Sequence, residues 1–149
     1  MDSVSSKIDI QFNIDYKVID KDLIDTNNRK ILADIEGSLI ISIDGNVYFQ
    51  ENYILLLEFA VFLTRWLAQI EKGIFQDFVY ETMDYGEGPI IEFKQKSNNL
   101  WVVNSIWARE NTVVNLRIQD IIIAAKDFLD DFQKDIYKKY LISLKNYLN

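Results

Sequence analysis

Apolar and polar residues alternate along two early stretches of the chain, which is typical of strands that bury one face. Residues 7–19 place apolar side chains on one face and charged or amide side chains on the other, and the alternation returns in residues 31–43. The pair Asp44-Gly45 then precedes residues 47–49, and an Asp-Gly pair between alternating segments favours a tight hairpin. The chain therefore begins with three predicted strands.

A helical period follows these strands. Residues 52–72 predict a helix with Asn52 as its N-cap and Gly73 in the left-handed position just after its C-terminus. This helix is apolar on nearly every side, so we expect it to be central to the domain or covered. A second helix is predicted over residues 119–148, where apolar residues recur at spacings of three and four.

Between the two helices the pattern returns to strands. Short turns rich in Gly, Asn and Ser separate four further predicted strands, at 74–82, 90–95, 100–107 and 112–118. The polar segment 20–30 predicts a surface connection, and we expect residues 1–6 to be disordered. The order βββ-α-ββββ-α predicts a single α+β domain over residues 1–149, in which both helices pack on one face of a twisted antiparallel sheet.

Composition removes several kinds of chemistry. The 149 residues include no His and no Cys, which excludes disulfides, thiolate nucleophiles, zinc-thiolate sites and the commonest general base. We therefore expect no enzyme activity, no metal site and no cofactor. The formal net charge of −7 argues against nucleic acid as a partner, because phosphate binding relies on Lys and Arg. The chain shows neither a signal peptide nor a long apolar run, so we expect a cytoplasmic protein without membrane contact.

Three clusters have a structural and a functional interpretation. Asp34 and Glu36 share a predicted strand face, an arrangement that suits acid–base chemistry or the binding of Mg²⁺ or Ca²⁺ as well as a solvated surface, and we favour the solvated surface. The last helix carries four aspartates that we interpret as a solvated face paired with Lys134 and Lys139. Those aspartates are Asp127, Asp130, Asp131 and Asp135. The residues Trp101, Val103 and Trp107 share another strand face, for which we favour core packing over a protein contact.

Acidic residues are concentrated on one predicted hairpin. Residues 71–92 carry a net charge of −5, whereas residues 133–149 carry +3. Acids mixed with tyrosines on a rigid edge suit electrostatic steering toward a basic protein, although solvation alone also explains such a cluster. The candidate partner-binding residues are Asp77, Glu81, Asp84, Tyr85, Glu87 and Glu92.

Four short motifs resemble a small, uncharacterised bacterial domain family. They lie at residues 34–43, 47–49, 56–60 and 65–67, and they include Glu36-Gly37-Ser38-Leu39, Tyr48-Phe49 and Leu56-Leu57-Glu58-Phe59-Ala60. In that family an EG-x-L strand pair leads through a YF hairpin into an LLEFA helix. In size, acidity and layout the chain also resembles the immunity proteins of bacterial polymorphic toxin systems. This resemblance implies a compact, cytoplasmic and catalytically inert binding protein.

Three hypotheses follow from these observations. The first is an acidic immunity-type inhibitor that occludes a basic toxin such as a nuclease. The second is a structural or assembly module that homodimerises through the first helix or through the face of Trp101 and Trp107. The third, an enzyme that uses Asp or Glu with Tyr, requires a pocket in which Asp34 or Glu36 meets other carboxylates.

Overall fold

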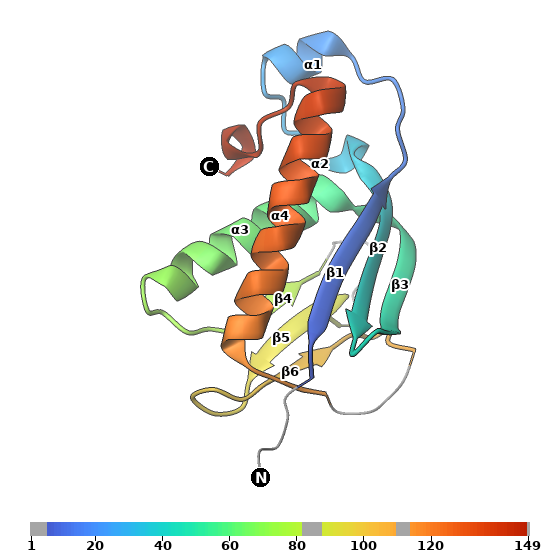
Figure 1. Cartoon of the computed structure of the whole chain (residues 1–149). Helices are drawn as coiled ribbons and strands as arrows, with labels where there is room; N and C mark the ends of the chain where they lie inside the picture. The colour runs from blue at the N-terminus through green and yellow to red at the C-terminus, as the bar shows by residue number, and fades with distance from the viewer. Residues whose placement is uncertain (1–5, 82–87, 110–113, 149) are drawn as a thin grey trace.

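The computed structural model describes residues 6–81, 88–109 and 114–148 and contains two antiparallel sheets (Figure 1). The first sheet has the order β1-β2-β3 and the second the order β4-β5-β6-β7. The strands of the first sheet are β1 (Ile8–Ile14), β2 (Glu36–Ile43) and β3 (Asn46–Leu55). Those of the second are β4 (Phe78–Tyr80), β5 (Ile91–Gln95), β6 (Trp101–Asn104) and β7 (Asn115–Leu116). The α+β class and the antiparallel pairing are confirmed, but the strands form two sheets instead of one.

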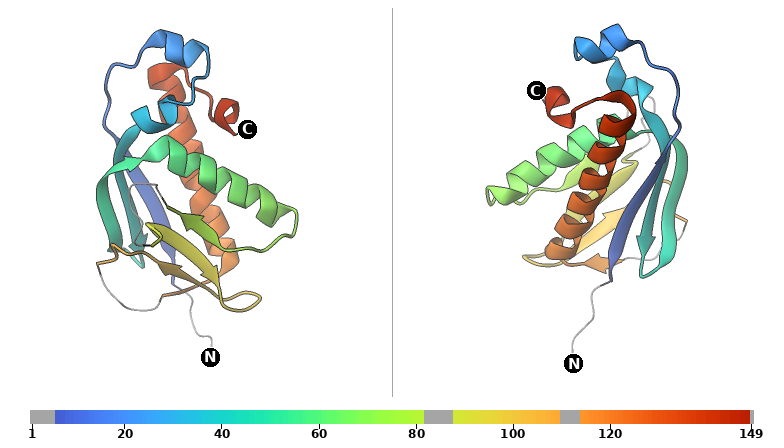
Figure 2. Two further views of the ribbon diagram at one scale, coloured as in Figure 1. Left: turned by 180° about the vertical axis from the view of Figure 1, so that it is seen from behind. Right: turned by 45° about the horizontal axis from the view of Figure 1, so that its top comes forward.

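Two long helices connect the sheets through aromatic contacts. Helix α4 (Ile118–Tyr140) packs against both β1 and helix α3 (Leu56–Glu71), and the right-hand view of Figure 2 shows it running between them. The ring of Phe128 on α4 meets Phe12 of β1 at 5.5 Å and Phe59 of α3 at 5.4 Å. Phe59 in turn contacts Phe78 of β4 at 5.9 Å. The core is therefore continuous from one sheet to the other, and the helices do not share one face of a single sheet.

The tight hairpin forms as predicted, and the apolar first long helix is buried as predicted. Asp44 and Gly45 have φ values of 51° and 82°, so both central turn residues adopt the left-handed conformation that matches strand twist. Gly73 has φ of 82° and follows the C-cap of α3, where its N–H donates to the carbonyl of Ile70. Nearly all apolar residues of α3 are buried, as expected for a central helix.

The N-terminal boundary of α3 differs from the prediction. Asn52 lies within β3, and its side-chain oxygen accepts a 2.7 Å hydrogen bond from the Ser38 hydroxyl on the neighbouring strand. The strand continues past Tyr53, whose φ is 63°, and the helix begins only at Leu56. The Asn52 side chain thus bonds to the neighbouring strand and does not cap the helix.

Two short helices replace predicted non-helical segments. Helix α1 (Lys21–Asp25) forms within the expected connection because the Asp20 carboxylate caps it by accepting from the N–H of Asp22. Helix α2 (Ile31–Asp34) occupies the start of the predicted strand 31–43. The core positions Ile31 and Ile35 are four residues apart, a spacing that fits the strand period and the helix period equally well.

The last helix is shorter than predicted. Helix α4 ends at Tyr140, because Leu141 adopts φ of 59°, and a short 3₁₀ helix η1 (Leu144–Tyr147) follows. The side chain of Gln133 fixes this turn by donating to the carbonyl of Ile142 and accepting from the N–H of Leu144. The returning segment buries Ile142, Leu144 and Tyr147, which a straight helix through 148 would not do.

Candidate functional site

Strand β4 presents alternate residues to the core and to solvent. Phe78 and Tyr80 are buried, whereas Asp77, Val79 and Glu81 are exposed. Because side chains alternate along a strand, the two acids flank Val79 on the outer face of the second sheet. Asp77 and Glu81 thus lie on the face opposite Phe78 and Tyr80.

Glu92 joins this outer face from the neighbouring strand. It pairs directly with Val79 across the β4–β5 ladder and accepts a 3.3 Å hydrogen bond from the Asn104 side chain. The Asp77 carboxylate is also fixed, since it accepts a 2.9 Å bond from the backbone N–H of Gln95. We call the residues Asp77, Val79, Glu81 and Glu92 the outer acidic face. The structure thus brings together three of the six predicted partner-binding residues.

The other three predicted residues, Asp84, Tyr85 and Glu87, lie outside the described residues. The structure describes only the base of this hairpin. The described residues run from Asp77 to Glu81 on the first side and begin again at Gly88 on the second side. The prediction for the tip stays a prediction.

Tyr80 connects β4 to α3 beneath the outer acidic face. The Tyr80 hydroxyl donates a 3.0 Å hydrogen bond to Glu58 on α3, and its ring packs edge-on against Phe59 and Phe62. Burial, and then the negative charge of Glu58, raise the pKa of the Tyr80 phenol well above its ordinary value. Tyr80 therefore stays neutral and serves as a structural hydrogen-bond donor between β4 and α3.

A groove of about 580 Å³ lies beside the outer acidic face, between α3 and the beginning of β4. Aromatic residues line it together with polar side chains, and the Trp66 indole N–H donates a 2.7 Å bond to the carbonyl of Gln76. Arg65 adds a cation that donates to the carbonyl of Leu148 at 3.2 Å. The lining residues are Phe62, Arg65, Trp66, Gln69, Gln76, Asp77, Phe78 and Val79.

Sequence reasoning missed the apolar residues at this site. Ile74 and Phe75, just before the groove-lining Gln76 in the chain, are 48% and 50% exposed, and Val79 is 39% exposed. Two bulky apolar residues directly after the helix-ending Gly73 were a usable signal, because the segment that follows a C-cap lies at the surface. The strand predicted over residues 74–82 would instead bury one of the two.

The carboxylate pair Asp34 and Glu36 does not share a strand face. Asp34 is the last residue of α2 and Glu36 the first of β2, because the chain changes from helix to strand between them. The Asp34 carboxylate instead approaches the Lys17 ammonium at 3.9 Å. Within the described part of the chain, no three acidic side chains gather as a metal site requires.

The aspartates of α4 are exposed, in agreement with the solvated interpretation, but their expected lysine partners differ. Neither Asp130–Lys134 nor Asp135–Lys139 forms an ion pair among the residues that the structure describes. Lys139 lies over the ring of Tyr16 at 5.3 Å instead.

The tryptophan face is part of the core. Trp101 is fully buried and its ring meets Trp66 at 5.9 Å, while Val103 is buried beside it. Strand β6 ends at Asn104, so Trp107 lies beyond it and is half-buried. Core packing is thus confirmed for Trp101 and Val103.

Among the described residues, no helix has both the length and the apolar content that crossing a membrane requires.

The comparison with protein families identifies the chain. A family model described as "Domain of unknown function (DUF7878)" matches residues 10–138. The chain belongs to this family. The matched region of the DUF7878 domain extends from β1 almost to the end of α4, so it includes both sheets, both long helices and the groove beside β4. Searches of curated proteins and of solved structures gave no match.

Proposed function

We propose that this DUF7878 protein is a non-catalytic binding protein whose outer acidic face receives a basic protein partner. The observation that supports the proposal is the combination of Asp77, Glu81 and Glu92 with exposed Val79 on one fixed surface beside a groove. An apolar centre with a charged rim is the usual composition of a protein interface. The rim attracts and orients the partner, while the apolar residues supply contact area.

The proposal extends to a specific class of function, an immunity-type inhibitor that occludes a basic toxin such as a nuclease. The support is the formal charge of −7, the acidic segment 71–92 and the lack of His and Cys. An inhibitor of this kind needs only to cover its target, so it requires no catalytic group of its own. We place this function in the cytoplasm, because disulfides are rare in that compartment and a chain without cysteine forms none.

The second hypothesis, a homodimer, finds less support. Both surfaces that it required are internal, since nearly all apolar residues of α3 are buried and Trp101 packs against Trp66. No exposed apolar face of comparable extent replaces them among the described residues, where exposed large apolar side chains are scattered over several elements.

The test compares two variants of equal net charge. The first carries Asp77→Asn, Glu81→Gln and Glu92→Gln, which remove charge but keep the hydrogen-bond acceptors of Asp77 and Glu92. The control carries Asp25→Asn, Asp127→Asn and Asp130→Asn, three exposed positions away from this face. Calorimetry measures the binding of each variant to whichever basic protein a neighbouring gene encodes.

We expect the first variant to bind on the order of tenfold more weakly at low salt, with a smaller salt dependence, and the control to bind like the unmodified protein. Equal weakening of both variants would mean that only net charge matters. No binding by the unmodified protein, or no difference between it and the first variant, contradicts the proposal.

A further inference from the structure

Strand β1 exposes one edge of the first sheet. It pairs only with β2 among the described strands, in an unbroken register from Ile8 to Ile14. The carbonyl of Lys7 accepts from Asp44 and the N–H of Asp15 donates to Glu36, so odd-numbered residues bond to β2. In an antiparallel ladder the even-numbered residues then direct their N–H and C=O groups away from that partner. Four residues form this free edge, which we name the β1 edge, namely Ile8, Ile10, Phe12 and Ile14.

The β1 edge is bounded at both ends. Before it, the N–H of Ser6 donates to the carbonyl of Asn115 in β7 at 3.1 Å. After it, the Tyr140 hydroxyl of α4 accepts from the N–H of Lys17 and donates to its carbonyl, at 3.0 and 2.8 Å. Between these two closures β1 contributes seven residues, which is a typical length for one paired strand.

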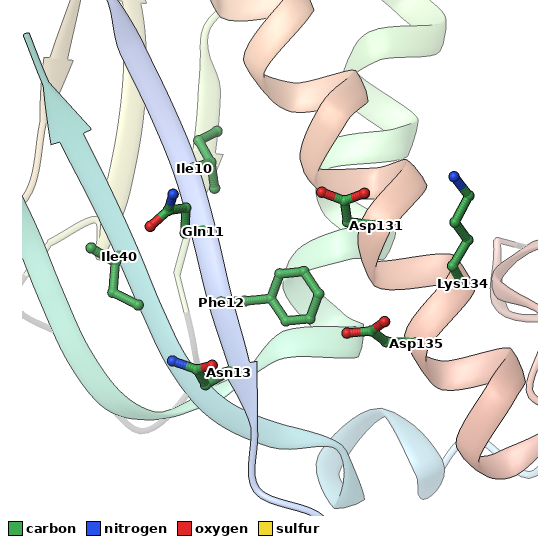
Figure 3. Close-up of a pocket in the computed structure, with 8 residues that line it drawn as sticks. All are labelled: Ile10, Gln11, Phe12, Asn13, Ile40, Asp131, Lys134 and Asp135. Carbon is green, nitrogen blue, oxygen red and sulfur yellow. The ribbon is translucent and has the colours of Figure 1, made fainter. Parts of the chain in front are cut away.

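A groove of about 400 Å³ lies along the β1 edge, between β1 and α4 (Figure 3). Figure 3 shows the carboxylates of Asp131 and Asp135 directed from α4 toward β1, whereas Lys134 extends away from the strand. Phe12 fixes the spacing of the two walls, because its ring packs against Phe128 and Phe132 at 5.5 and 5.4 Å. The groove thus has a strand edge on one side and two negative charges on the other.

Natural proteins protect free strand edges with a proline, a bulge, an inward charge or a covering helix or loop. Strand β1 has no Pro, a regular register and apolar inward side chains, so α4 is the element that flanks its edge. The groove leaves the space beside residues 10–13 open between the two elements, and a regular apolar strand with an open edge is a template for a further strand. We infer that the β1 edge binds an extended segment of a partner protein by strand addition.

Charge determines the composition of that segment. Asp131 and Asp135 are one helical turn apart and face the place where the added strand would lie. Lys or Arg side chains at alternate positions of the added strand would point to one face and reach these carboxylates. A second copy of this chain suits the groove less well, because it would bring the same aspartates and a further −7 to the interface. The occupant is therefore a basic, extended segment of a different protein.

This inference stands apart from the proposed function, because the β1 edge and the outer acidic face belong to different sheets. A defined probe tests it without knowledge of the natural partner. The probe is a capped heptapeptide that alternates Val and Lys, and two control peptides carry either Glu in place of Lys or N-methyl groups on alternate amides. Amide hydrogen exchange on the whole protein measures which backbone N–H groups become protected.

We expect the Val-Lys peptide to slow exchange at the even-numbered amides of the β1 edge by about tenfold or more, as new hydrogen bonds require. The N-methylated and Glu peptides should give no such protection. The variant Asp131→Asn with Asp135→Asn should weaken peptide binding on the order of tenfold, while Asp127→Asn with Asp130→Asn should leave it unchanged.

Three outcomes would overturn the inference. The first is binding of the peptide without protection of the Ile10 and Phe12 amides, which would indicate charge attraction alone. The second is equal binding of the N-methylated peptide. The third is protection that depends on protein concentration in the absence of peptide, which would identify a second copy of the chain as the occupant.

Discussion

At the scale of single residues, Gly37 shows how closely the first two strands approach each other. It lies opposite Ile14 in the β1–β2 ladder and is buried. A Cβ atom at this position would overlap the carbonyl oxygen of Asn13 and lie 2.9 Å from the Cα of Ile14. Both atoms belong to the backbone of β1, so no side-chain rotation relieves the overlap.

We therefore expect Gly37→Ala to lower the free energy of unfolding by about 3 kcal/mol, the upper part of the range for overpacking. Gly73→Ala is the matched control. A Cβ there meets nothing within 4 Å, and its φ of 82° adds only about 1–2 kcal/mol of left-handed strain. Urea denaturation of both variants measures the difference, and an equal loss at the two sites would contradict the steric argument.

At the scale of elements, the C-terminus of α4 carries a backbone strain that a substitution can relieve. Leu141 has a left-handed backbone with φ of 59°, its N–H completes the end of the helix, and its side chain is 70% exposed. A leucine in this conformation is held there by the turn that returns Ile142 and Leu144 to the core, not by its own preference.

Leu141→Gly should stabilise the protein. Removing about 1–2 kcal/mol of left-handed strain exceeds the roughly 0.5–1 kcal/mol that glycine adds in unfolded-state entropy, so we expect a net gain of up to about 1 kcal/mol. Lys138→Gly, at an exposed position inside the same helix, should instead cost about 1 kcal/mol. Thermal denaturation of both variants checks the opposite signs, and destabilisation by Leu141→Gly would mean that the leucine side chain supports the turn.

At the scale of the whole molecule, buried tyrosines connect stability to alkaline pH. Burial raises the pKa of Tyr80 above its ordinary value of 10.0, and the neighbouring Glu58 raises it further. The neutral phenol is thus favoured in the folded state. Its contribution to stability is fully present below pH 10 and is lost as the pH rises toward the folded pKa, because the unfolded chain then binds fewer protons.

We expect the free energy of unfolding to fall above about pH 10 by roughly 1.4 kcal/mol per pH unit for Tyr80. Tyr80→Phe removes the hydrogen bond to Glu58 and should cost about 1–2 kcal/mol near pH 7. The variant lacks the titrating group, so the two stability curves should converge as the pH rises. Urea denaturation from about pH 8 to about pH 11 measures this, and parallel curves would contradict the assignment.

The sequence by itself determined the features that depend on local backbone preference and side-chain period. The Asp44-Gly45 turn, the glycine after α3, the buried character of α3 and the alternation of β4 all follow from residues adjacent in the chain. For the same reason, the exposure of Asp77 and Glu81 opposite Phe78 and Tyr80 was predictable.

Only the tertiary structure decided which elements meet. The spacing of Ile31 and Ile35 fits a helix and a strand equally, and packing selected α2. Asn52 is a residue type that caps helices, but its side chain instead accepts a hydrogen bond from Ser38 on the paired strand. The division into two sheets and the two grooves both depend on contacts between segments that are distant in the chain, such as β1 with α4. No local sequence pattern reports the free energy of such contacts.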